Sequence, residues 1–479
     1  MASVRDTFDV VVIGAGTAGM TAARLTAEAG HKTAMIEAEK VGGECLYTGC
    51  VPSKAYIESA KVFHLMRNAA NYGLRADGIA VDFPKVVARK DAIIAEIARS
   101  ENAEVYRRVG VDVIEGQATF VDAHTLRVGD REITGKEIVV ATGSEESVPH
   151  IPGLKEAGYL TNLEVLQGIT ELPKSVVVLG GGPIGCEFAQ LFARFCVPTT
   201  IIGRNARLLP KEDPEMSAML RDILVREGVT VHTGAEAKHI EVVGDEKRVT
   251  AARGDATFTV TAHAIIVSAG RKPRVASLNL AAAGVEMTGK GVVVNEALQT
   301  TVPHIWAAGD VTGLFQFTHV AEYQGRLVAD NIGKPGKKPK HKKADYRVVP
   351  WATFTDPEVA RVGLTEEEAR KEHGDKVEVL RWPFDRVDRA LTMGETQGII
   401  KVIIGPRPIT GMAGGGRILG AHIIGPHAGD ILHELVLNMQ LDAFSGRVAQ
   451  AIHAYPTLAL GVRQAMGQRW DAGVEPLGE

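Results

Sequence analysis

Two segments of this chain repeat one arrangement, in which an apolar run is followed by a glycine-rich turn, a longer mixed stretch and a second apolar run. They are FDVVVIGAGTAGMTAARLTAEAGHKTAMIEAE (8–39) and SVVVLGGGPIGCEFAQLFARFCVPTTIIGRNARLLP (175–210). A continuous Val/Ile run is typical of a strand buried on both faces, and the Ala/Leu pattern that follows is typical of a helix. The sequence therefore predicts two α/β units, each built from a strand, a turn, a helix and a second strand.

The turns of both units carry the spacing GxGxxG. Glycines at these places allow a tight turn and the close approach of a pyrophosphate, which the N-terminus of the next helix stabilises. A lone GxGxxG is weak evidence, but here strand, turn and helix are in register, so two bound dinucleotides are predicted and a mere tight turn is disfavoured. The glycines are Gly14, Gly16, Gly19, Gly180, Gly182 and Gly185.

The residue at the end of the second strand distinguishes the two predicted ligands. In the first unit this residue is Glu37, which is placed to accept hydrogen bonds from a ribose. The same offset in the second unit lands on Gly203, followed by Arg204 and Arg207. Because an acid would repel a 2′-phosphate and arginines can pair with it, the second unit favours NADPH over NADH. The alternative is that both arginines are solvated surface charges, and NADH stays possible.

Length and composition limit the function classes. A chain of 479 residues is long enough for about three domains. With 45% hydrophobic and 23% charged residues and a net charge of -4, it offers no electrostatic case for nucleic acid or an anionic membrane as partner. The start MASVRDTFDVVVIG has no features of a targeting signal, and no apolar run approaches the roughly 18 residues of a membrane span. We expect a cytoplasmic enzyme that acts on a small molecule.

Four cysteines in so long a chain do not form a secreted disulfide framework. Cys45 and Cys50 lie close together in GGECLYTGC (42–50), and such a pair could be a structural staple, a metal site or a redox device. A zinc site would need a second pair with its own short spacing, whereas Cys186 and Cys196 lie ten residues apart in a segment expected to be helical. A metal site is therefore disfavoured.

The remaining sequence predicts a linker and a separate C-terminal domain. The stretch GKPGKKPKHKK (333–343) is basic but lacks interleaved aromatic residues, so we interpret it as a solvated linker rather than a nucleic-acid site. From about residue 346 strands and turns alternate, with GMAGGGRILG (411–420) predicted to form a hairpin and AGDILHELVLNMQL (428–441) a helical region. The segment IWAAGDVTG (305–313) is predicted to be another strand that ends at a ligand.

The two dinucleotide units, GGECLYTGCVPSK (42–54), AAGD (307–310) and YPTL (455–458) occur in an order that resembles the class I flavoprotein disulfide reductases. This family includes dihydrolipoamide dehydrogenase, glutathione reductase and mercuric reductase. The resemblance implies FAD in the first unit, a nicotinamide cofactor in the second, and a homodimer formed through the C-terminal domain. The implied fold is α/β, with two Rossmann-like dinucleotide-binding domains and a C-terminal α+β dimerisation domain. The implied boundaries are FAD-binding 1–150 and, with the linker, 276–345; NAD(P)-binding 151–275; and dimerisation 346–479.

The resemblance also implies roles for individual residues. Cys50 would face the flavin and Cys45 would exchange with substrate, while Lys54 and Glu187 would form an ion pair beside the flavin ring. The residues implied to hold FAD are Gly14, Gly16, Gly19, Glu37, Gly43, Cys45, Lys54, Gly116, Gly143, Asp310 and Thr318. Those implied to hold NAD(P)H are Gly180, Gly182, Gly185, Arg204, Arg207 and Gly270.

The spacing around the cysteine pair supports the redox interpretation. If this stretch is helical, Cys50 and Lys54 lie four residues apart and share a face. A nearby cation stabilises the thiolate that thiol–disulfide exchange requires. A structural disulfide would gain little from a lysine at this place.

The sequence departs from the family at its late segment. The family carries His-Pro-Thr followed by Glu, and that His-Glu pair moves protons for the exchanging thiol; here the run is HAYPTLAL (453–460). Tyr455 occupies the His position and Leu460 the Glu position. A phenol with an ordinary pKa near 10 is a poor base at neutral pH. The favoured interpretation of Tyr455 is a catalytic residue that donates a hydrogen bond to a substrate or metal-thiolate, and the alternative is an aromatic residue of the interface. His453 lies two residues earlier and could point to the same side, although a packing role at an interface is the favoured interpretation.

Three hypotheses follow for the electron acceptor. The first is a mercuric-reductase-like FAD enzyme that passes electrons from NADPH to a small disulfide, metal ion, quinone or other electrophile, because WPFDRVDRALTMGETQG (382–398) and FTHVAEYQGR (317–326) resemble that branch. No cysteine follows Cys196 and the N-terminal metal-binding domain is missing, so strong mercury detoxification is not expected. The second is a dihydrolipoamide dehydrogenase in which His453 or water replaces the missing base. The third is a slow redox-sensing flavoprotein.

Overall fold

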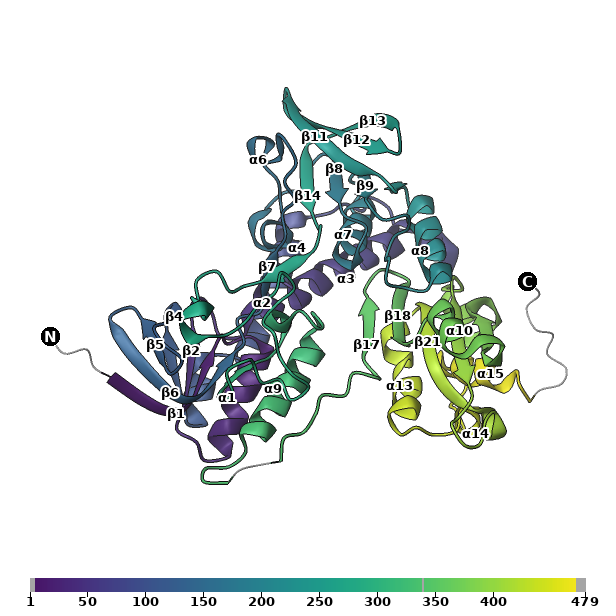
Figure 1. Cartoon of the computed structure of the whole chain (residues 1–479). Coiled ribbons are helices and arrows are strands. Elements are labelled where there is room, and N and C mark those ends of the chain that lie inside the picture. Colours follow the sequence, from purple (N-terminus) through teal and green to yellow (C-terminus); the bar gives the residue numbers. More distant parts are fainter. Residues whose placement is uncertain (1–4, 338–339, 471–479) are drawn as a thin grey trace.

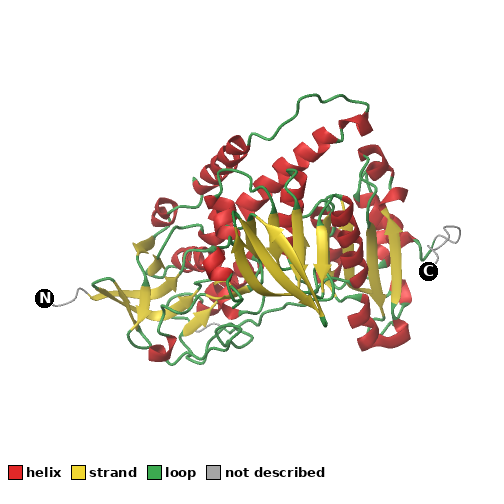
Figure 2. Cartoon of the chain, turned by 90° about the horizontal axis from the view of Figure 1, so that it is seen from above, coloured by secondary structure: helices red, strands yellow, loops and turns green. Residues whose placement is uncertain are grey.

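The computed structural model describes residues 5–337 and 340–470. Figure 1 shows three parts: one on the left that combines purple to blue with green segments, a blue to teal one at the top, and a green to yellow one on the right. In Figure 2 the strands of these parts form separate groups, with helices between and around them. This mixed α/β architecture is the fold class that the sequence predicts. The positions of the domain boundaries stay a prediction.

The first part is built on a sheet whose order is β3-β2-β1-β6-β5-β4, with β16 paired to β6. Its elements are β1 (Arg5–Ile13), β2 (Thr33–Glu37), β3 (Val111–Glu115), β4 (Ala118–Phe120), β5 (Thr125–Val128), β6 (Arg131–Val140), β16 (Ile305–Ala307), α1 (Thr17–Glu28), α5 (Ala103–Arg108) and α9 (Thr318–Ile332). Val10 of β1 pairs in parallel with Thr33 on one side and Glu137 on the other. This central strand is buried on both faces, which explains its unbroken apolar run. Helices α1 and α9 pack side by side (Figure 1).

The second part repeats the arrangement with the parallel order β10-β9-β8-β14. Its elements are β8 (Val176–Leu179), β9 (Thr199–Gly203), β10 (Thr230–Thr233), β14 (Ala264–Val267), α6 (Leu154–Ala157), α7 (Pro183–Arg194), α8 (Pro214–Arg226) and the antiparallel strands β11 (Glu236–Val243), β12 (Glu246–Arg253) and β13 (Ala256–Ala262). The short pair β7 (Ser144–Glu146) and β15 (Arg271–Pro273) lies where the chain passes between the two parts.

One expectation about this part is wrong. Helix α7 ends at Arg194, so Cys196 lies outside it. Cys196 has a φ of 65°, and its N–H bonds to the carbonyl of Ala193. Pro198 follows two residues later and cannot continue a helix, which accounts for the early end.

The third part is a five-stranded antiparallel sheet in the order β17-β18-β21-β20-β19. Its strands are β17 (Pro350–Thr353), β18 (Glu358–Gly363), β19 (Glu378–Pro383), β20 (Ile399–Gly405) and β21 (Arg417–Gly425), and its helices are α10 (Glu366–His373), α11 (Asp388–Met393), α12 (Ala428–Ile431), α13 (His433–Gln440), α14 (Gly446–Gln450) and α15 (Ala459–Gly467). Strands β20 and β21 form the expected hairpin across the glycine-rich turn. The DAGVEPLGE end falls on residues 471–479, outside the described residues, as do residues 338–339 of the basic stretch.

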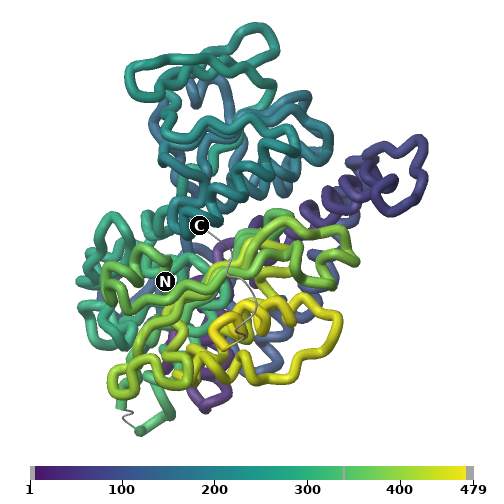
Figure 3. Tube along the Cα trace, turned by 90° about the vertical axis from the view of Figure 1, so that its right-hand side faces the viewer, coloured from purple at the N-terminus to yellow at the C-terminus, as the bar shows by residue number. Residues whose placement is uncertain are grey.

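A helical hairpin joins the three parts. It consists of α3 (Cys50–Arg67) and α4 (Phe83–Ala98), preceded by the short α2 (Gly43–Tyr47). Tyr56 and Phe83 of the hairpin share a buried core with Phe188 of α7. Figure 3 shows the far end of this hairpin as a purple arm projecting beyond the body of the molecule. The packing of α3 places its first residue, Cys50, between the first and second parts. No helix in residues 5–337 and 340–470 has the length and apolar character needed to cross a membrane.

Candidate active site

One large cavity connects both glycine-rich turns with the cysteine pair. Its volume is about 2200 Å³, and its walls come from all three parts of the chain. Pockets for a single drug-sized ligand typically measure about 300–1,000 Å³, so this cavity has room for more than one such ligand. It is therefore large enough for the two dinucleotides that the glycine motifs predict.

The first turn has the shape that a pyrophosphate needs. Gly14 has a φ of 101°, and a Cβ there would lie 2.5 Å from the carbonyl oxygen of Ala141. A Cβ on Gly19 would lie 1.9 Å from the carbonyl oxygen of Gly14, whereas nothing lies within 4 Å of a Cβ on Gly16. Gly16 also lines the cavity, so the backbone is bare where a ligand would approach. Glu37 accepts a hydrogen bond from Ala15 N–H at 2.6 Å and retains lone pairs for a ribose.

The second turn repeats this geometry. Gly180 has a φ of 132°, and a Cβ there would lie 2.3 Å from the carbonyl oxygen of Ser268. A Cβ on Gly185 would lie 2.1 Å from the carbonyl oxygen of Gly180, while the place of a Cβ on Gly182 is open. Arg204 lines the cavity. Arg207 is instead directed to the carbonyl oxygen of Pro210, 3.2 Å away.

The two cysteines lie together on successive helices, with Cys45 in α2 and Cys50 at the start of α3. Both are free thiols in this structure, so their disulfide stays a prediction. The hydroxyl of Thr318, at the start of α9, lies 3.2 Å from Cys45 Sγ and 3.6 Å from Cys50 Sγ. A residue predicted to hold FAD therefore also bridges the two sulfurs.

The pKa values of the two thiols diverge. A hydrogen bond with Cys45, helped by Thr318 and the Lys54 cation, lowers the pKa of Cys50 to about 6 despite burial. The same hydrogen bond and burial raise the pKa of Cys45 above its ordinary range. At neutral pH Cys50 is therefore the thiolate and Cys45 the thiol. The N-terminus of α3 also favours negative charge at Cys50.

The predicted ion pair forms beside the thiols. Lys54 Nζ lies 2.9 Å from Glu187 Oε2, and only 6% of the Glu187 side chain is exposed. The other carboxylate oxygen accepts a hydrogen bond from Phe354 N–H at 2.9 Å. Lys54 Nζ also lies 4.4 Å from the centroid of the Phe354 ring. One lysine in the first part thus contacts both the second and the third part.

A polar chain next to Cys45 was not foreseen from the sequence. Arg271 is ion-paired with Glu44, whose pKa is raised by burial. Its guanidinium Nε donates to Ser144 Oγ at 2.8 Å, and Ser144 Oγ donates to Asp310 at 2.6 Å. Burial also raises the pKa of Asp310. The acid directly before Cys45 was the available signal, but its partner Arg271 lies far away in sequence. The other predicted cofactor residues that line the cavity are Gly43, Gly116, Gly143 and Gly270.

The chain matches known proteins over most of its length. Residues 8–325 match the family model "Pyridine nucleotide-disulphide oxidoreductase", and residues 349–466 match its dimerisation domain. The chain belongs to this family. Its members depend on FAD and a pyridine nucleotide.

Relatives in the family carry different functional names. A mercuric reductase of Lysinibacillus sphaericus is 36% identical over 463 residues, covering 96% of this chain and 82% of the relative. A dihydrolipoyl dehydrogenase of Bacillus subtilis (strain 168) is 35% identical over 475 residues, covering 96% and 97%. The HOCl-induced flavoprotein disulfide reductase RclA from Escherichia coli, solved as a Cu(II) complex, has a TM-score of 0.84 at 30% identity and covers 96% of this chain and 99% of RclA.

The late segment of this family member is not brought to the thiols within one chain. His453 has Nε2 2.9 Å from a Glu434 carboxylate oxygen and Nδ1 3.1 Å from the carbonyl oxygen of Ala451. Both nitrogens face acceptors, so neither offers a free lone pair to a thiol. The Tyr455 hydroxyl donates to Asp388 at 2.9 Å, and this bond raises the pKa of Tyr455. The catalytic roles of His453 and Tyr455 stay predictions.

Aromatic residues from two parts stack at one wall of the cavity. The Phe317 ring lies 5.5 Å from the His319 ring at 10° and 5.4 Å from the Trp351 ring at 19°. Trp351 Nε1 donates to Glu212 at 2.7 Å. The other oxygen of this buried carboxylate has no partner among the described residues, and burial raises the pKa of Glu212. No periodicity or motif in the sequence indicated this wall.

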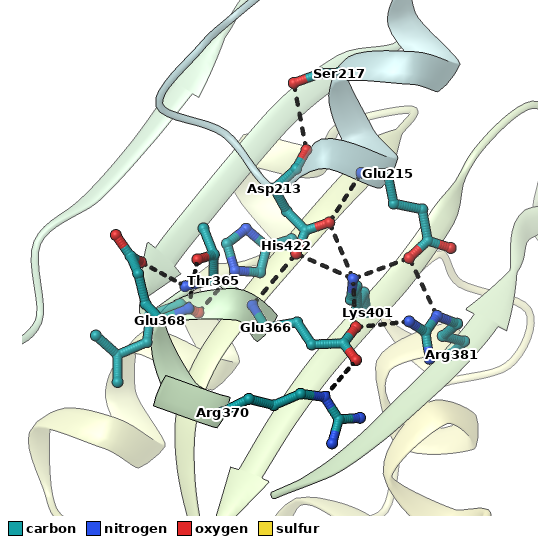
Figure 4. A network of polar contacts seen from close by, with 11 residues as sticks. Asp213, Glu215, Ser217, Thr365, Glu366, Glu368, Arg370, Arg381, Lys401 and His422 are labelled. Atoms are coloured by element: carbon teal, nitrogen blue, oxygen red, sulfur yellow. Dashed lines mark hydrogen bonds and ion pairs between the residues drawn. The ribbon is translucent and has the colours of Figure 1, made fainter. Parts of the chain in front are cut away.

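A buried charge cluster fixes the second part against the third (Figure 4). Lys401 Nζ on β20 lies 3.0 Å from Asp213, 3.0 Å from Glu215 and 2.9 Å from Glu366. Arg381 also forms ion pairs with Glu215 and Glu366. Asp213 is also the N-cap of α8 and directly follows residues that line the cavity. The cluster therefore holds one edge of the cavity in place.

Proposed function

We propose that the chain is an FAD-dependent enzyme that uses NADPH to reduce a Cys45–Cys50 disulfide and then passes the electrons to a small disulfide, metal ion or other electrophile. One observation carries this proposal: a thiolate–thiol pair lies in the same cavity as both glycine-rich turns. The Lys54–Glu187 pair beside it supports the same conclusion. A cytoplasmic location stays a prediction of the sequence.

The residues present fit both cofactors. The bare backbone at Gly14, Gly16 and Gly19, together with Glu37, would hold the FAD dinucleotide, and the turn at Gly180 would hold the second one. FAD, when bound, supplies a centre that takes a hydride from the nicotinamide and passes two electrons to a disulfide.

The side chains of this protein would carry out the thiol chemistry. Lys54 and the start of α3 hold negative charge on Cys50. The Thr318 hydroxyl donates a hydrogen bond to Cys45 Sγ and also contacts Cys50 Sγ, which keeps the two sulfurs adjacent. Cys45, in the short helix α2, exchanges with the acceptor, and Cys50 then attacks Cys45 to close the disulfide.

An anaerobic titration with NADPH tests this function. Binding of FAD and reduction of the disulfide predict a long-wavelength absorption between the Cys50 thiolate and the flavin. The band should be absent in Cys50→Ser and retained in Cys186→Ser, because Cys186 is buried in α7 away from the cavity wall. Protein that takes up FAD but gives no such band would contradict the proposal.

The preference for NADPH rests on the arginines after β9. Arg204 lines the cavity, whereas Arg207 reaches the adjacent Pro210 carbonyl. Loss of one exposed charge-assisted contact to a 2′-phosphate should raise the KM for NADPH about tenfold. We therefore expect Arg204→Ala to raise this KM and leave the KM for NADH unchanged. An equal rise in the KM for NADPH and for NADH would show that Arg204 does not bind the 2′-phosphate.

The acceptor is the open part of the proposal. A metal ion or a disulfide is favoured by the relatives named mercuric reductase and by RclA, which was solved with Cu(II). A screen of disulfides, metal ions and quinones with NADPH and NADH in parallel addresses the acceptor directly.

A dihydrolipoamide dehydrogenase is the second candidate. Full-length similarity to the Bacillus subtilis enzyme favours it. Rapid turnover of dihydrolipoamide with NAD, lost in His453→Ala, would establish this second function instead of the first.

We further propose that the protein is a homodimer formed through its C-terminal part. The matching dimerisation model supports this arrangement. The C-terminal part also exposes large apolar side chains, among them Leu437, Leu441 and Ile452. Light scattering after size exclusion should give twice the mass of the chain, and Leu437→Asp should reduce it to the mass of one chain.

A further inference from the structure

The exchanging thiol of this protein needs a base. At neutral pH Cys50 already carries the negative charge, while Cys45, the thiol that would meet the acceptor, holds its proton. Thiol–disulfide exchange proceeds through the thiolate, so Cys45 must lose that proton before it attacks. This inference rests on the proposed dithiol function.

The residues of the late segment are poorly suited to the task. Both ring nitrogens of His453 face acceptors, and the Tyr455 hydroxyl is bonded to a carboxylate. Glu187 is committed to Lys54 and to the Phe354 N–H. Among the described residues of one chain, a base with a free lone pair must therefore come from elsewhere in the cavity.

His319 has such a lone pair. It follows Thr318, whose hydroxyl contacts both sulfurs, and it lies on the first turn of α9. Its Nε2 lies 2.7 Å from the carbonyl oxygen of Pro350, so this nitrogen must carry the hydrogen. The other nitrogen, Nδ1, is then the one with the lone pair. His319, Cys45 and Cys50 all line the same cavity.

The surroundings of His319 keep it in its basic form. His319 is exposed, and Phe317 and the Pro350 carbonyl of β17 cover part of its ring. This partial burial lowers the pKa of His319 below its ordinary value, and nearby His433 of α13 acts in the same direction. Glu358 and Asp430 also line the cavity. Burial has the largest effect on the pKa of His319 and favours the neutral imidazole.

We propose that His319 is the proton acceptor and donor for thiol–disulfide exchange at Cys45, in place of the histidine that the family carries where this chain has Tyr455. A general base must lie within hydrogen-bond reach of the proton or one water away. His319 lines the same cavity as Cys45 and directly follows Thr318, whose hydroxyl lies 3.2 Å from Cys45 Sγ, so the proposed route of the proton from Cys45 to His319 passes through one water.

The exchange balances as follows. His319 takes the proton of Cys45, and the Cys45 thiolate attacks a disulfide RSSR to form a mixed disulfide and release RS⁻. The protonated His319 gives its proton to RS⁻. Cys50 thiolate then attacks Cys45, which closes the Cys45–Cys50 bond and releases a second RS⁻ that takes a proton from water. The dithiol loses two electrons and RSSR gains them.

Single turnovers of the reduced, FAD-loaded enzyme with hydroxyethyl disulfide test the proposal. General base assistance is typically worth 10²–10⁴-fold, so His319→Gln should slow reoxidation at pH 7 by about 100-fold. Glutamine can still donate to the Pro350 carbonyl, so the fold around α9 is retained. In the wild type the rate should rise with pH up to the pKa of His319, which lies below the ordinary histidine value of about 6.5, and should stay constant above that pKa. In His319→Gln it should keep rising towards the raised pKa of Cys45.

Three controls separate a proton-transfer role from a structural one. Ferricyanide takes single electrons without thiol exchange, so its reduction should be unchanged in His319→Gln. His433→Gln should behave like the wild type with both acceptors. Added imidazole should restore disulfide turnover to His319→Ala. The proposal is overturned if His319→Gln slows ferricyanide reduction as much as reoxidation by the disulfide. It is also overturned if His319→Gln slows disulfide reoxidation less than threefold, or if His433→Gln slows it instead. Absence of the long-wavelength band in the wild type would instead mark failure of the proposed dithiol function.

Discussion

Cys50 should be the more reactive cysteine of the reduced protein at low pH, and the size of the effect can be worked out. With a pKa of about 6, half of Cys50 is thiolate at pH 6. An ordinary thiol with a pKa near 8.5 is only about 0.3% thiolate at that pH. The ratio of thiolate fractions is therefore roughly 160.

The lower pKa also makes each thiolate less nucleophilic. With a Brønsted coefficient of about 0.45, a fall of about 2.5 units costs roughly 13-fold in intrinsic rate. Cys50 should thus react about tenfold faster than an ordinary thiol at pH 6. At pH 8, where about a quarter of an ordinary thiol is ionised, Cys50 should be about threefold slower. This reversal is a sharper signature than the rate at any single pH.

Iodoacetamide alkylation followed by mass spectrometry measures the effect. The reduced protein should carry Cys196→Ser, because Cys196 is exposed and would add a background signal. N-acetylcysteine in the same tube serves as the ordinary thiol.

Variants then test the physical causes. Cys45→Ala removes the hydrogen bond that lowers the pKa of Cys50 most, so it should give the largest rise in the midpoint pH of Cys50 alkylation. Lys54→Met should raise this midpoint by about one pH unit. A wild-type midpoint above about pH 8, or alkylation of Cys45 before Cys50, would refute the reasoning.

Two further predictions follow from buried contacts. Lys401→Met leaves the carboxylate of Asp213, which is 1% exposed, without its cation, and should lower the free energy of unfolding by about 3–5 kcal/mol at pH 7 in urea titrations. Although burial raises it, Lys401 and neighbouring arginines lower the pKa of Glu366 to about 2. The stabilisation from these ion pairs of Glu366 is present above the unfolded-state pKa of about 4 and is lost as the pH falls towards 2. The difference in free energy of unfolding between the wild type and Lys401→Met should therefore shrink over that range. A difference that stays constant would contradict this. Gly185→Ala places a Cβ 2.1 Å from the Gly180 carbonyl oxygen and should abolish NADPH binding in a fluorescence titration while the FAD-to-protein ratio stays unchanged. Unchanged NADPH affinity would show that the second turn does not hold the nucleotide.

The sequence predicted the elements whose signals are local. The buried strands β1 and β8 were visible as unbroken Val/Ile runs, and the turns after them as glycine spacings, because backbone sterics act over a few residues. The pairing of Cys50 with Lys54 on one helical face likewise follows from a spacing of four. The end of α7 was misjudged because the helical pattern around Cys196 continued past the true end at Arg194.

Local sequence patterns do not predict contacts between distant segments, so such contacts were expected only where the family resemblance implied them. The Lys54–Glu187 pair was expected only for that reason, since α3 and α7 have no common periodicity. The Glu44–Arg271 pair and the wall formed by Phe317 and Trp351 had no signal that linked their members. Each joins residues more than thirty positions apart, and such residues meet only when sheets and helices have packed.

The sequence by itself determined that this chain has two dinucleotide-binding units and a close pair of cysteines at a helix start, because glycine geometry and helical spacing are properties of short segments. Only the tertiary structure decided how strongly the pKa values of the two cysteines diverge and which ring nitrogen of His319 carries the hydrogen. Those properties depend on burial, on the Thr318 hydroxyl and on the Pro350 carbonyl, which come from different parts of the chain and meet only in the folded protein.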